Sequence, residues 1–375
     1  MKQNKIYLIG IIMACYLFGC TQKKDEGNAF RILDYEKAQP IEYANLFDVQ
    51  GVIIIPLETT EQSIISDNFI VKLMDGNVFV FDYHRGQVLR FNLEGKFLNS
   101  IGEQGKGPEE LLNPSDFYID PKNQTVEILC EPGSTIKKFS FQGEFRSKLS
   151  FDFPSHSFIK DSKDGYYFYR GVNSGYSEYR VTYVDASSKI NELLMDPGNA
   201  PVGLVMDKQC FVENNGVVFL KEILFNQIVF LAQGRLIDGV KIHFGENDIR
   251  LDDLPNYPGM MAFFQQLDSD GFHSIKSFDV LDNHAFLSFQ YQKASDDLKT
   301  HFMSLNLLTD EMISVSKNGD NELFRNLEFQ MLLPDNKFLF AISSHNYHLL
   351  ENTIPTNAFE SFAIKEDDNP VLIVF

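Results

Sequence analysis

The chain has no tryptophan, only 4 cysteines among 375 residues, and far fewer basic than acidic side chains. Lysine and arginine number 33 against 52 aspartates and glutamates, which gives a formal net charge of -19. A protein that binds nucleic-acid phosphates needs a basic surface, so this class is excluded. A composition of 44% hydrophobic and 23% charged residues also excludes a disordered chain, a collagen and a multi-span membrane protein.

Phenylalanine and tyrosine, by contrast, are abundant. The 35 Phe and 15 Tyr residues bring the aromatic content to 13%. Both residue types favour β-strands, because they pack well on a half-buried pleated surface. The composition therefore predicts a β-rich soluble body.

The N-terminus carries the parts of a secretory signal peptide, predicted for residues 1–19. Lys2 and Lys5 precede an apolar run over residues 6–18, which is too short to span a bilayer. Leu17-Phe18-Gly19-Cys20 resembles the lipobox of bacterial lipoproteins. This resemblance implies that Cys20 carries the lipid, palmitate included, and anchors the protein to the outer membrane; an ordinary signal peptide with an incidental Cys is the alternative.

Residues 20–40 are predicted to form a polar tether, and residues 41–375 the folded body. Lys24-Asp25-Glu26 resembles the signal that sends lipoproteins of the Bacteroidetes type to the cell surface, although a generic linker has the same composition. Two cysteines, Cys130 and Cys210, lie within the body beside apolar runs. They are predicted to be separate thiols, while the exported location leaves a disulfide open.

A turn followed at once by a short apolar strand recurs six times, at intervals of about fifty residues. Asp-Gly, Asn-Gly and Asp-Asn pairs tolerate the positive φ angles of tight hairpins. The six turns lie at residues 75–77, 121–123, 164–165, 214–216, 282–283 and 335–336. Residues 89–97 also align without gaps on residues 137–145, which adds a second hairpin to each unit.

Two hairpins in about fifty residues are the dimensions of one β-propeller blade. The sequence therefore predicts an all-β fold, a six-bladed β-propeller. The signature of WD repeats is absent because the chain has no Trp. The last unit has too few strands, so residues 52–57 are predicted to complete it beside residues 369–375 and close the ring. The alternative is that residues 52–57 begin a β-sandwich.

The segments 97–110, 113–117 and 368–372 resemble the blade linkers and the last strand of NHL-type propellers, in particular the six-bladed β-propeller lipoproteins of the Bacteroidetes type. The resemblance implies the fold and the lipid anchor. It transfers no catalytic residues.

No familiar catalytic or metal motif is evident. Gly102, Gly105 and Gly107 lack the spacing of a dinucleotide site and are predicted to form a connector between blades. His345 and His348 lack the glutamate and the third ligand of a zinc protease, and no metal ligands are assigned. No cofactor is predicted, although calcium among the many acidic residues stays open.

Loop lengths differ between the two faces of the predicted propeller. The turns within each unit are minimal, whereas the alternate connections are long, and residues 254–264 in one of them are apolar and aromatic. That segment is expected to cap the channel or to meet a partner. Residue types common in binding sites are expected on the same face as these connections, and they are the candidate ligand-face residues: Tyr83, Arg85, Arg170, Tyr176 and Tyr257.

The sequence thus favours a lipid-anchored binding or scaffold module of the cell surface. Its partners would be the membrane, through the lipid, and a glycan, a peptide or an envelope protein. The alternative is a metal-dependent propeller enzyme, a hydrolase, lactonase or lyase, with its site at the channel mouth.

Overall fold

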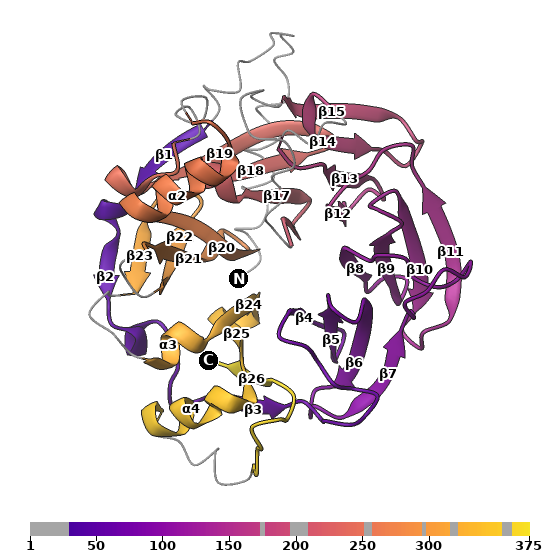
Figure 1. The fold of residues 1–375 in the computed structure, drawn as a ribbon, viewed down its shortest axis with the longest axis horizontal. Helices are drawn as coiled ribbons and strands as arrows, with labels where there is room; N and C mark the ends of the chain where they lie inside the picture. Colours follow the sequence, from indigo (N-terminus) through magenta and orange to yellow (C-terminus); the bar gives the residue numbers. More distant parts are fainter. Residues whose placement is uncertain are drawn as a thin grey trace, which may run out of the picture.

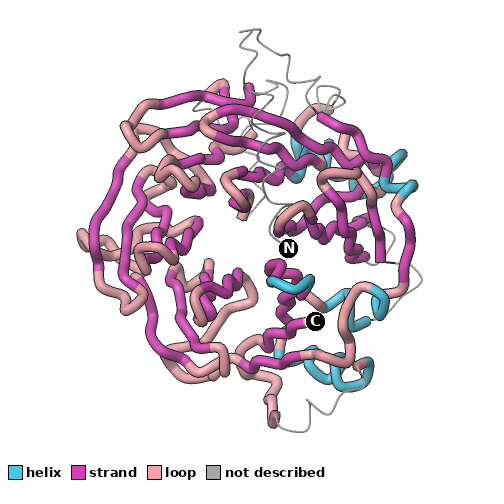
Figure 2. The backbone as a smooth tube through the Cα atoms, turned by 180° about the vertical axis from the view of Figure 1, so that it is seen from behind, coloured by secondary structure: helices cyan, strands magenta, loops and turns pink. Residues whose placement is uncertain are grey.

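A computed structural model describes residues 30–172, 177–195, 209–250, 257–294, 298–315, 322–354 and 362–375. Its strands form six sheets arranged radially around a central axis, as Figure 1 shows. The predicted six-bladed β-propeller is confirmed. Figure 2 shows that the few helices are gathered in one half of the ring.

Blades 1 to 3 are four-stranded antiparallel sheets that follow one another along the chain. Blade 1 contains β4 (Phe69–Met74), β5 (Asn77–Asp82), β6 (Gln87–Asn92) and β7 (Phe97–Ile101). Blade 2 contains β8 (Asp116–Asp120), β9 (Thr125–Cys130), β10 (Thr135–Ser140) and β11 (Phe145–Ser150). Blade 3 contains β12 (Ser157–Lys160), β13 (Tyr166–Tyr169), β14 (Tyr179–Val184) and β15 (Ile190–Met195).

Blades 4 to 6 each include a strand from the N-terminal segment. Blade 4 contains β16 (Phe211–Asn214), β17 (Val217–Glu222), β18 (Gln227–Ala232), β19 (Arg235–His243) and β1 (Phe30–Asp34). Blade 5 contains β20 (Phe272–Leu281), β21 (His284–Gln292), β22 (Lys299–Asn306), β23 (Met312–Val315) and β2 (Gln39–Ile41). Blade 6 contains β24 (Glu328–Leu333), β25 (Lys337–Ile342), β26 (Val371–Val374) and β3 (Ile53–Pro56).

The helices lie in connections between strands. The α-helices are α2 (Met260–Asp270), α3 (Glu322–Asn326) and α4 (Tyr347–Thr353). The 3₁₀ helices are η3 (Tyr35–Lys37), η4 (Tyr43–Asn45), η5 (Ile223–Phe225), η6 (Gly245–Asn247), η8 (Pro334–Asn336) and η9 (Ser344–Asn346).

The predicted tight turns join the first two strands of the blades. Asn215 and Gly216, between β16 and β17, have φ angles of 53° and 82°, and Asp282, between β20 and β21, has a φ of 53°. Asparagine, aspartate and glycine tolerate this left-handed region better than other residues. All six of these turns lie on one face of the ring, here called the short-turn face, and the alternate connections lie on the opposite long-loop face.

The ring closes as the sequence predicted. β3 pairs antiparallel with β26, with Ile53 opposite Val374 and Pro56 opposite Val371. Asn369, which is 3% exposed, ties the following segment to this blade: its Nδ2 donates to the carbonyl oxygens of Glu58 and Ser63 at 2.9 and 2.7 Å, and its Oδ1 accepts from the backbone N–H of Ile65 at 2.9 Å. Blade 6 is therefore built from both ends of the chain.

The folded body begins earlier than the predicted tether allowed. β1 pairs parallel with β19, and β2 pairs parallel with β23, so both add an outer fifth strand to a blade (Figure 1). Leu33 and Tyr35 are buried in the core that blades 4 and 5 share. The boundary at residue 40 is corrected to Phe30, because the apolar side chains of this short segment bury against the blades. Residues 20–29 lie outside the described ranges.

Six apolar clusters form the core, and each lies between two neighbouring blades. The largest joins blades 5 and 6 and includes Phe47, from the segment between β2 and β3. The Phe47 ring lies 5.5 Å from Phe340 and 5.4 Å from Phe375, measured between centroids. The last residue of the chain is thus part of the core.

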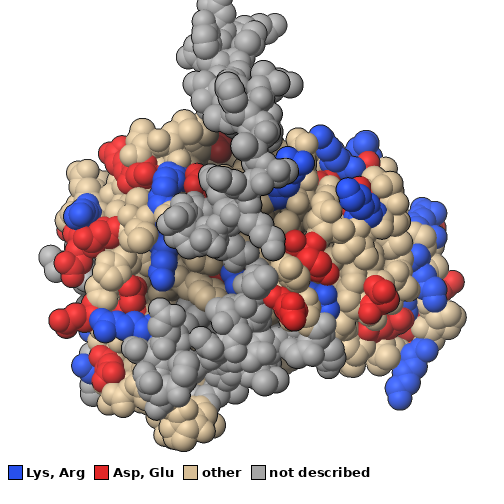
Figure 3. Space-filling view, turned by 90° about the horizontal axis from the view of Figure 1, so that it is seen from above, with Lys and Arg blue, Asp and Glu red and all other residues tan. Residues whose placement is uncertain are grey.

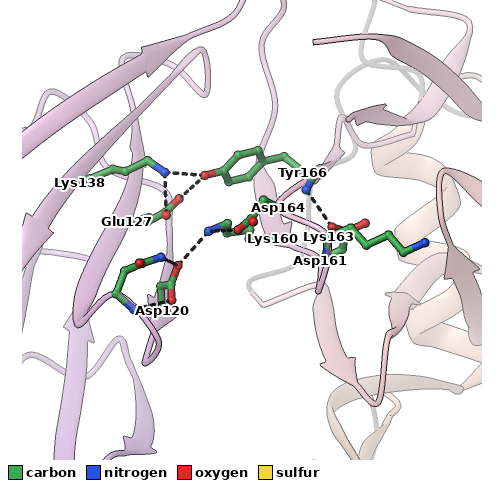
Figure 4. A network of polar contacts seen from close by, with 10 residues as sticks. Asp120, Glu127, Lys138, Lys160, Asp161, Lys163, Asp164 and Tyr166 are labelled. Atoms are coloured by element: carbon green, nitrogen blue, oxygen red, sulfur yellow. Dashed lines mark hydrogen bonds and ion pairs between the residues drawn. The ribbon is translucent and has the colours of Figure 1, made fainter. Parts of the chain in front are cut away.

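Buried polar contacts also join the blades. Glu127 of blade 2, which is 1% exposed, accepts from Lys138 Nζ and from the Tyr166 hydroxyl of blade 3, both at 2.8 Å (Figure 4). Beside it, Lys160 Nζ of blade 3 lies 2.9 Å from Asp120 of blade 2 and 2.7 Å from Asp164. Burial works against the charge of Lys160, but these two carboxylates outweigh it and raise its pKa.

Cys130 and Cys210 are both buried, and neither forms a disulfide within the described residues, which confirms the prediction of two separate thiols. Burial raises the pKa of the Cys130 thiol to about 11. A thiol with such a pKa is almost wholly protonated at neutral pH and is a poor nucleophile.

Candidate functional site

A cavity of about 1190 Å³ opens on the long-loop face, at the mouth of the central channel. Blades 1, 4, 5 and 6 contribute its walls, through the ends of β20, β21, β24 and β25 and the loops beside them. Small-molecule sites in proteins occupy roughly 300 to 1,000 Å³. The cavity therefore has room for a ligand larger than a single small metabolite.

The wall that blade 5 presents to blade 6 changes from apolar to polar toward this face. Side chains alternate along a strand, so Phe286, Ser288, Gln290 and Gln292 of β21 lie on one side of the sheet. Phe286 is 1% exposed and packs with the Phe329 ring of blade 6 at 4.7 Å. The next three positions on that side are hydroxyl or amide side chains, and all three line the cavity.

We call this part of the cavity the 5–6 cleft. Its polar residues include Ser274, Ser288, Gln290 and Thr300 of blade 5 and Asn326 and Ser344 of blade 6. Ser288 is bonded to Ser277, and Ser344 donates to the carbonyl oxygens of Glu366 and Asp368 at 2.7 Å. Asn326 bonds Asn346 and Glu322.

Three polar side chains of the cleft form no such hydrogen bonds. Within the described part of the chain, Ser274, Gln290 and Thr300 make no side-chain hydrogen bond. They lie together, because Gln290 of β21 stands opposite both Ser274 of β20 and Thr300 of β22 in the sheet register. The structure thus groups donors and acceptors that remain available to a ligand.

Helix α2 stands beside the cavity. Its Phe263 is 2% exposed and packs in a small apolar cluster with Val172 and Ile249, and Tyr257 lies against it with ring centroids 5.5 Å apart. Phe264 and Phe272, both half-buried, line the cavity. The apolar part of the long connection therefore packs on the propeller and supplies aromatic rings to the cavity edge; residues 254–256 lie outside the described ranges.

Two carboxyl groups in the channel have raised pKa values. Burial raises the pKa of Asp116 in β8 and of Asp279 in β20 to about 6, while the charge of Lys72 in β4 acts in the opposite direction. Asp116 accepts from the backbone N–H of Phe158 at 3.0 Å, and Asp279 accepts from that of Leu332 at 2.7 Å. Each carboxyl group thus joins the inner strands of two neighbouring blades.

The rim of the cavity carries charges of both signs. Lys276 and Arg325 are exposed there, and so are Glu328, Glu366 and Asp367. In the view of Figure 3, basic and acidic side chains are likewise interspersed over the visible edge of the ring. Of the described residues that line the cavity, five are acidic and three are basic, so the entrance has a small excess of negative charge.

The sequence-predicted candidates occupy different environments. Tyr83 is half-buried, with its ring 4.6 Å from Phe81, and Arg85 donates to the carbonyl oxygen of Ile64 at 2.6 Å. Arg170 is 6% exposed, lies 3.6 Å from Glu192 and stacks over Phe153 at 5.2 Å, so its side chain belongs to the interior. Tyr176 and Cys20 lie outside the described residues.

None of the described candidates lines the cavity. Sequence reasoning instead missed Ser274, Gln290 and Thr300. The signal that could have found them is the alternation in residues 285–292, where one side of the strand becomes polar while the other stays apolar and aromatic.

The glycine-rich connector offers no anion site. Gly102 has a φ of 75°, as expected of a turn between blades, and the Glu110 carboxylate accepts from the backbone N–H of Gly107 at 2.7 Å. Among the described residues, no group of three histidine, cysteine or acidic side chains could hold a metal ion. Within the same ranges, no helix has the length and apolar composition that crossing a membrane requires.

Comparisons with known proteins identify the fold. Residues 30–375 match the profile of a family described as a domain of unknown function, DUF4934, and no curated protein sequence matches. A solved structure described as that of an exported protein from Bacteroides fragilis is 14% identical, with a TM-score of 0.73, covering 92% of this chain and 99% of that one. A member of the DUF4221 family from Bacteroides vulgatus is 10% identical, with a TM-score of 0.51, covering 87% and 95%. At these identities the similarities show the fold alone.

Proposed function

The chain belongs to the DUF4934 family, and from this premise we propose that it is an exported, lipid-anchored binding module that takes its ligand on the long-loop face. The family description assigns no activity, so the proposal rests on the geometry of the site. Binding is the function favoured by a cavity with available hydrogen-bonding groups. Nothing in the described part of the chain favours the hydrolase, lactonase or lyase alternative.

One observation carries this proposal. The cavity of about 1190 Å³ lies on the face with the long connections, and the walls combine polar side chains with half-buried aromatic rings. The opposite face carries minimal turns. Rigid blades that display variable loops around a cavity are a common arrangement for recognition.

The lipid anchor is supported by the lipobox-like sequence before Cys20, and export by the protein of the same fold that is described as exported. Several alkyl chains on Cys20 would insert into the membrane, and each buried CH₂ group would contribute about 0.8 kcal/mol to the binding free energy. Together these contributions suffice for stable attachment. Lys24-Asp25-Glu26 would direct the anchored protein to the cell surface. The ligand would then be a glycan, a peptide or a neighbouring envelope protein.

Replacing the anchor residue tests the attachment. In Cys20→Ser we expect no incorporation of labelled palmitate and no processing of the signal peptide, because the acylated sulfur is gone. Labelling of wild-type and variant cells, followed by gel analysis, measures both. Replacing Lys24, Asp25 and Glu26 by alanine should keep the label but reduce antibody staining of intact cells. Palmitate that persists on the serine variant would contradict the anchor.

The ligand face is tested by blocking each face in turn. Gln292→Cys on the long-loop face and Lys122→Cys on the short-turn face place an exposed thiol for a bulky maleimide label, while Cys130 and Cys210 are buried. The full-length protein in detergent is offered neutral oligosaccharides, anionic oligosaccharides and peptides. We expect the label at position 292 to weaken binding at least tenfold and the label at 122 to leave it within twofold.

The opposite pattern would contradict the proposed face. Binding that neither label alters, or a failure of every ligand in the panel to bind, would contradict the proposal as well.

A further inference from the structure

The two sides of blade 5 differ in a way that folding alone does not require. On the side facing blade 4, Ile275 and Phe289 are fully buried, and His273 lies 4.9 Å from Tyr291 between ring centroids. On the side facing blade 6, at the same height, the side chains are those of Ser274, Ser288, Gln290 and Thr300. An interface between blades gains stability from apolar burial, so stability does not explain the polar side chains on this side, and a role in binding does.

The hydrogen-bonding character of this wall points to an uncharged ligand. The hydroxyl groups of Ser274 and Thr300 and the amide of Gln290 each donate and accept. The hydroxyl groups of a sugar also donate and accept, so one wall can satisfy several of them at once. A phosphate or a carboxylate, which only accepts when ionised, would leave the acceptors of the wall unpaired.

The aromatic edge of the cavity fits the same chemistry. Phe264 and Phe272 line it and are half-buried, so each leaves part of a ring in contact with solvent. The C–H face of a pyranose ring is apolar and gains free energy when it leaves water against such a surface. A ligand with polar edges and apolar faces therefore matches both kinds of wall.

The charge and the size of the cavity restrict the chemical class of the ligand further. Among the described residues that line the cavity, five are acidic and three are basic, so a polyanion meets no field of positive charge. The volume of about 1190 Å³ exceeds the roughly 300 to 1,000 Å³ of small-molecule sites. An oligomer fits such a space better than a single sugar.

We propose that the 5–6 cleft binds a neutral oligosaccharide, with Ser274, Gln290 and Thr300 as the residues that bond its hydroxyl groups. This inference rests on the proposed function, because it names the ligand class of the face assigned there. A peptide, whose backbone also offers donors and acceptors, is the competing class.

The test uses the full-length protein in detergent and a panel of neutral hexasaccharides: malto-, cello-, xylo-, manno- and laminarihexaose. Hexagalacturonate and a mixture of hexapeptides serve as anionic and peptide probes. Isothermal titration calorimetry on the wild type is expected to show binding of at least one neutral hexasaccharide. Gln290→Leu and Thr300→Val are each expected to weaken that binding at least tenfold, because each removes hydrogen bonds at nearly constant shape.

Gln124→Leu and Thr125→Val are matched controls at the short-turn end of blade 2. They should leave binding within twofold, and all four variants should melt within a few degrees of the wild type, because none of the four side chains makes a hydrogen bond among the described residues. A wild type that binds only hexagalacturonate or peptides, or no hexasaccharide at all, would overturn the inference. So would neutral binding that both cleft variants leave unchanged.

The two proposals can fail separately. If a peptide binds and the label at position 292 blocks it, the long-loop face remains the ligand face and only the oligosaccharide class is wrong. If a hexasaccharide binds and only the label at position 122 blocks it, both proposals are wrong.

Discussion

Removing residues 369–375 is expected to leave a chain that no longer unfolds in one cooperative step. The deletion takes away β26, which holds β25 on one side and β3 on the other, so blade 6 is divided and the ring opens. The side chains from Val371 to Phe375 are at most 5% exposed. At about 2 kcal/mol for each, their loss is of the same order as the whole stability of a typical domain.

The opened ring would also expose two unpaired strand edges, which promote aggregation. Thermal unfolding followed by circular dichroism and size-exclusion chromatography measures both effects. A protein that starts at Phe30 is the control, because it keeps every described strand. Asn369→Ala provides a milder test: it removes three hydrogen bonds to the segment 58–65 and should cost about 3 kcal/mol. A truncated protein that melts like the wild type would contradict closure through blade 6.

Arg180→Met is expected to destabilise the protein by about 3 to 5 kcal/mol. Arg180 of blade 3 and Glu222 of blade 4 are 5% and 1% exposed, and their Nε and Oε1 atoms lie 2.7 Å apart. Gln227 donates to the other carboxylate oxygen at 2.6 Å, and the guanidinium lies over the Phe225 ring at 4.8 Å. The substitution leaves a buried carboxylate without its cation, and this accounts for the large cost.

The double variant Arg180→Met with Glu222→Gln removes both charges and keeps an acceptor for Gln227. We expect it to recover more than half of the loss in the free energy of unfolding, measured by urea denaturation. Lys37→Met, in the exposed pair of Lys37 with Asp34 at 3.7 Å, is the control and should change stability by less than about 1 kcal/mol. A double variant as unstable as Arg180→Met alone would contradict the argument from the buried charge.

The propeller could be predicted because its signals are local and repeated. Turn pairs such as Asn215-Gly216 announce a hairpin, and the spacing of the six turns gives the number of blades. The closing strand was predictable because residues 52–57 are apolar and the last unit lacks a strand. β1 and β2 were missed, since their pairing partners lie some two hundred residues away or more and a three- to five-residue strand carries little pattern. The NHL-type resemblance stays a prediction.

The candidate site was harder to predict. Loop lengths identify the long-loop face, but they do not say which side chains reach the cavity: Arg170 follows β13 directly and is nevertheless buried against Phe153. The alternation of polar and apolar residues in β21 can be recognised in the sequence. Whether the polar residues line a cavity, however, depends on which side of the strand faces blade 6. A register shift between Ile275 and Ser277 helps to set that orientation, and no local pattern announces it.

Hydrogen exchange of the full-length protein, with and without the neutral hexasaccharide that binds best, tests the central claim most directly. Ligand in the 5–6 cleft is predicted to slow exchange in residues 325–327, 343–346 and 366–368, which border the cavity outside the strands. The turns at residues 121–124 and 334–336, on the short-turn face, should exchange as before. Protection confined to those turns, or to blades 2 and 3, would contradict the assignment of the ligand to the channel mouth.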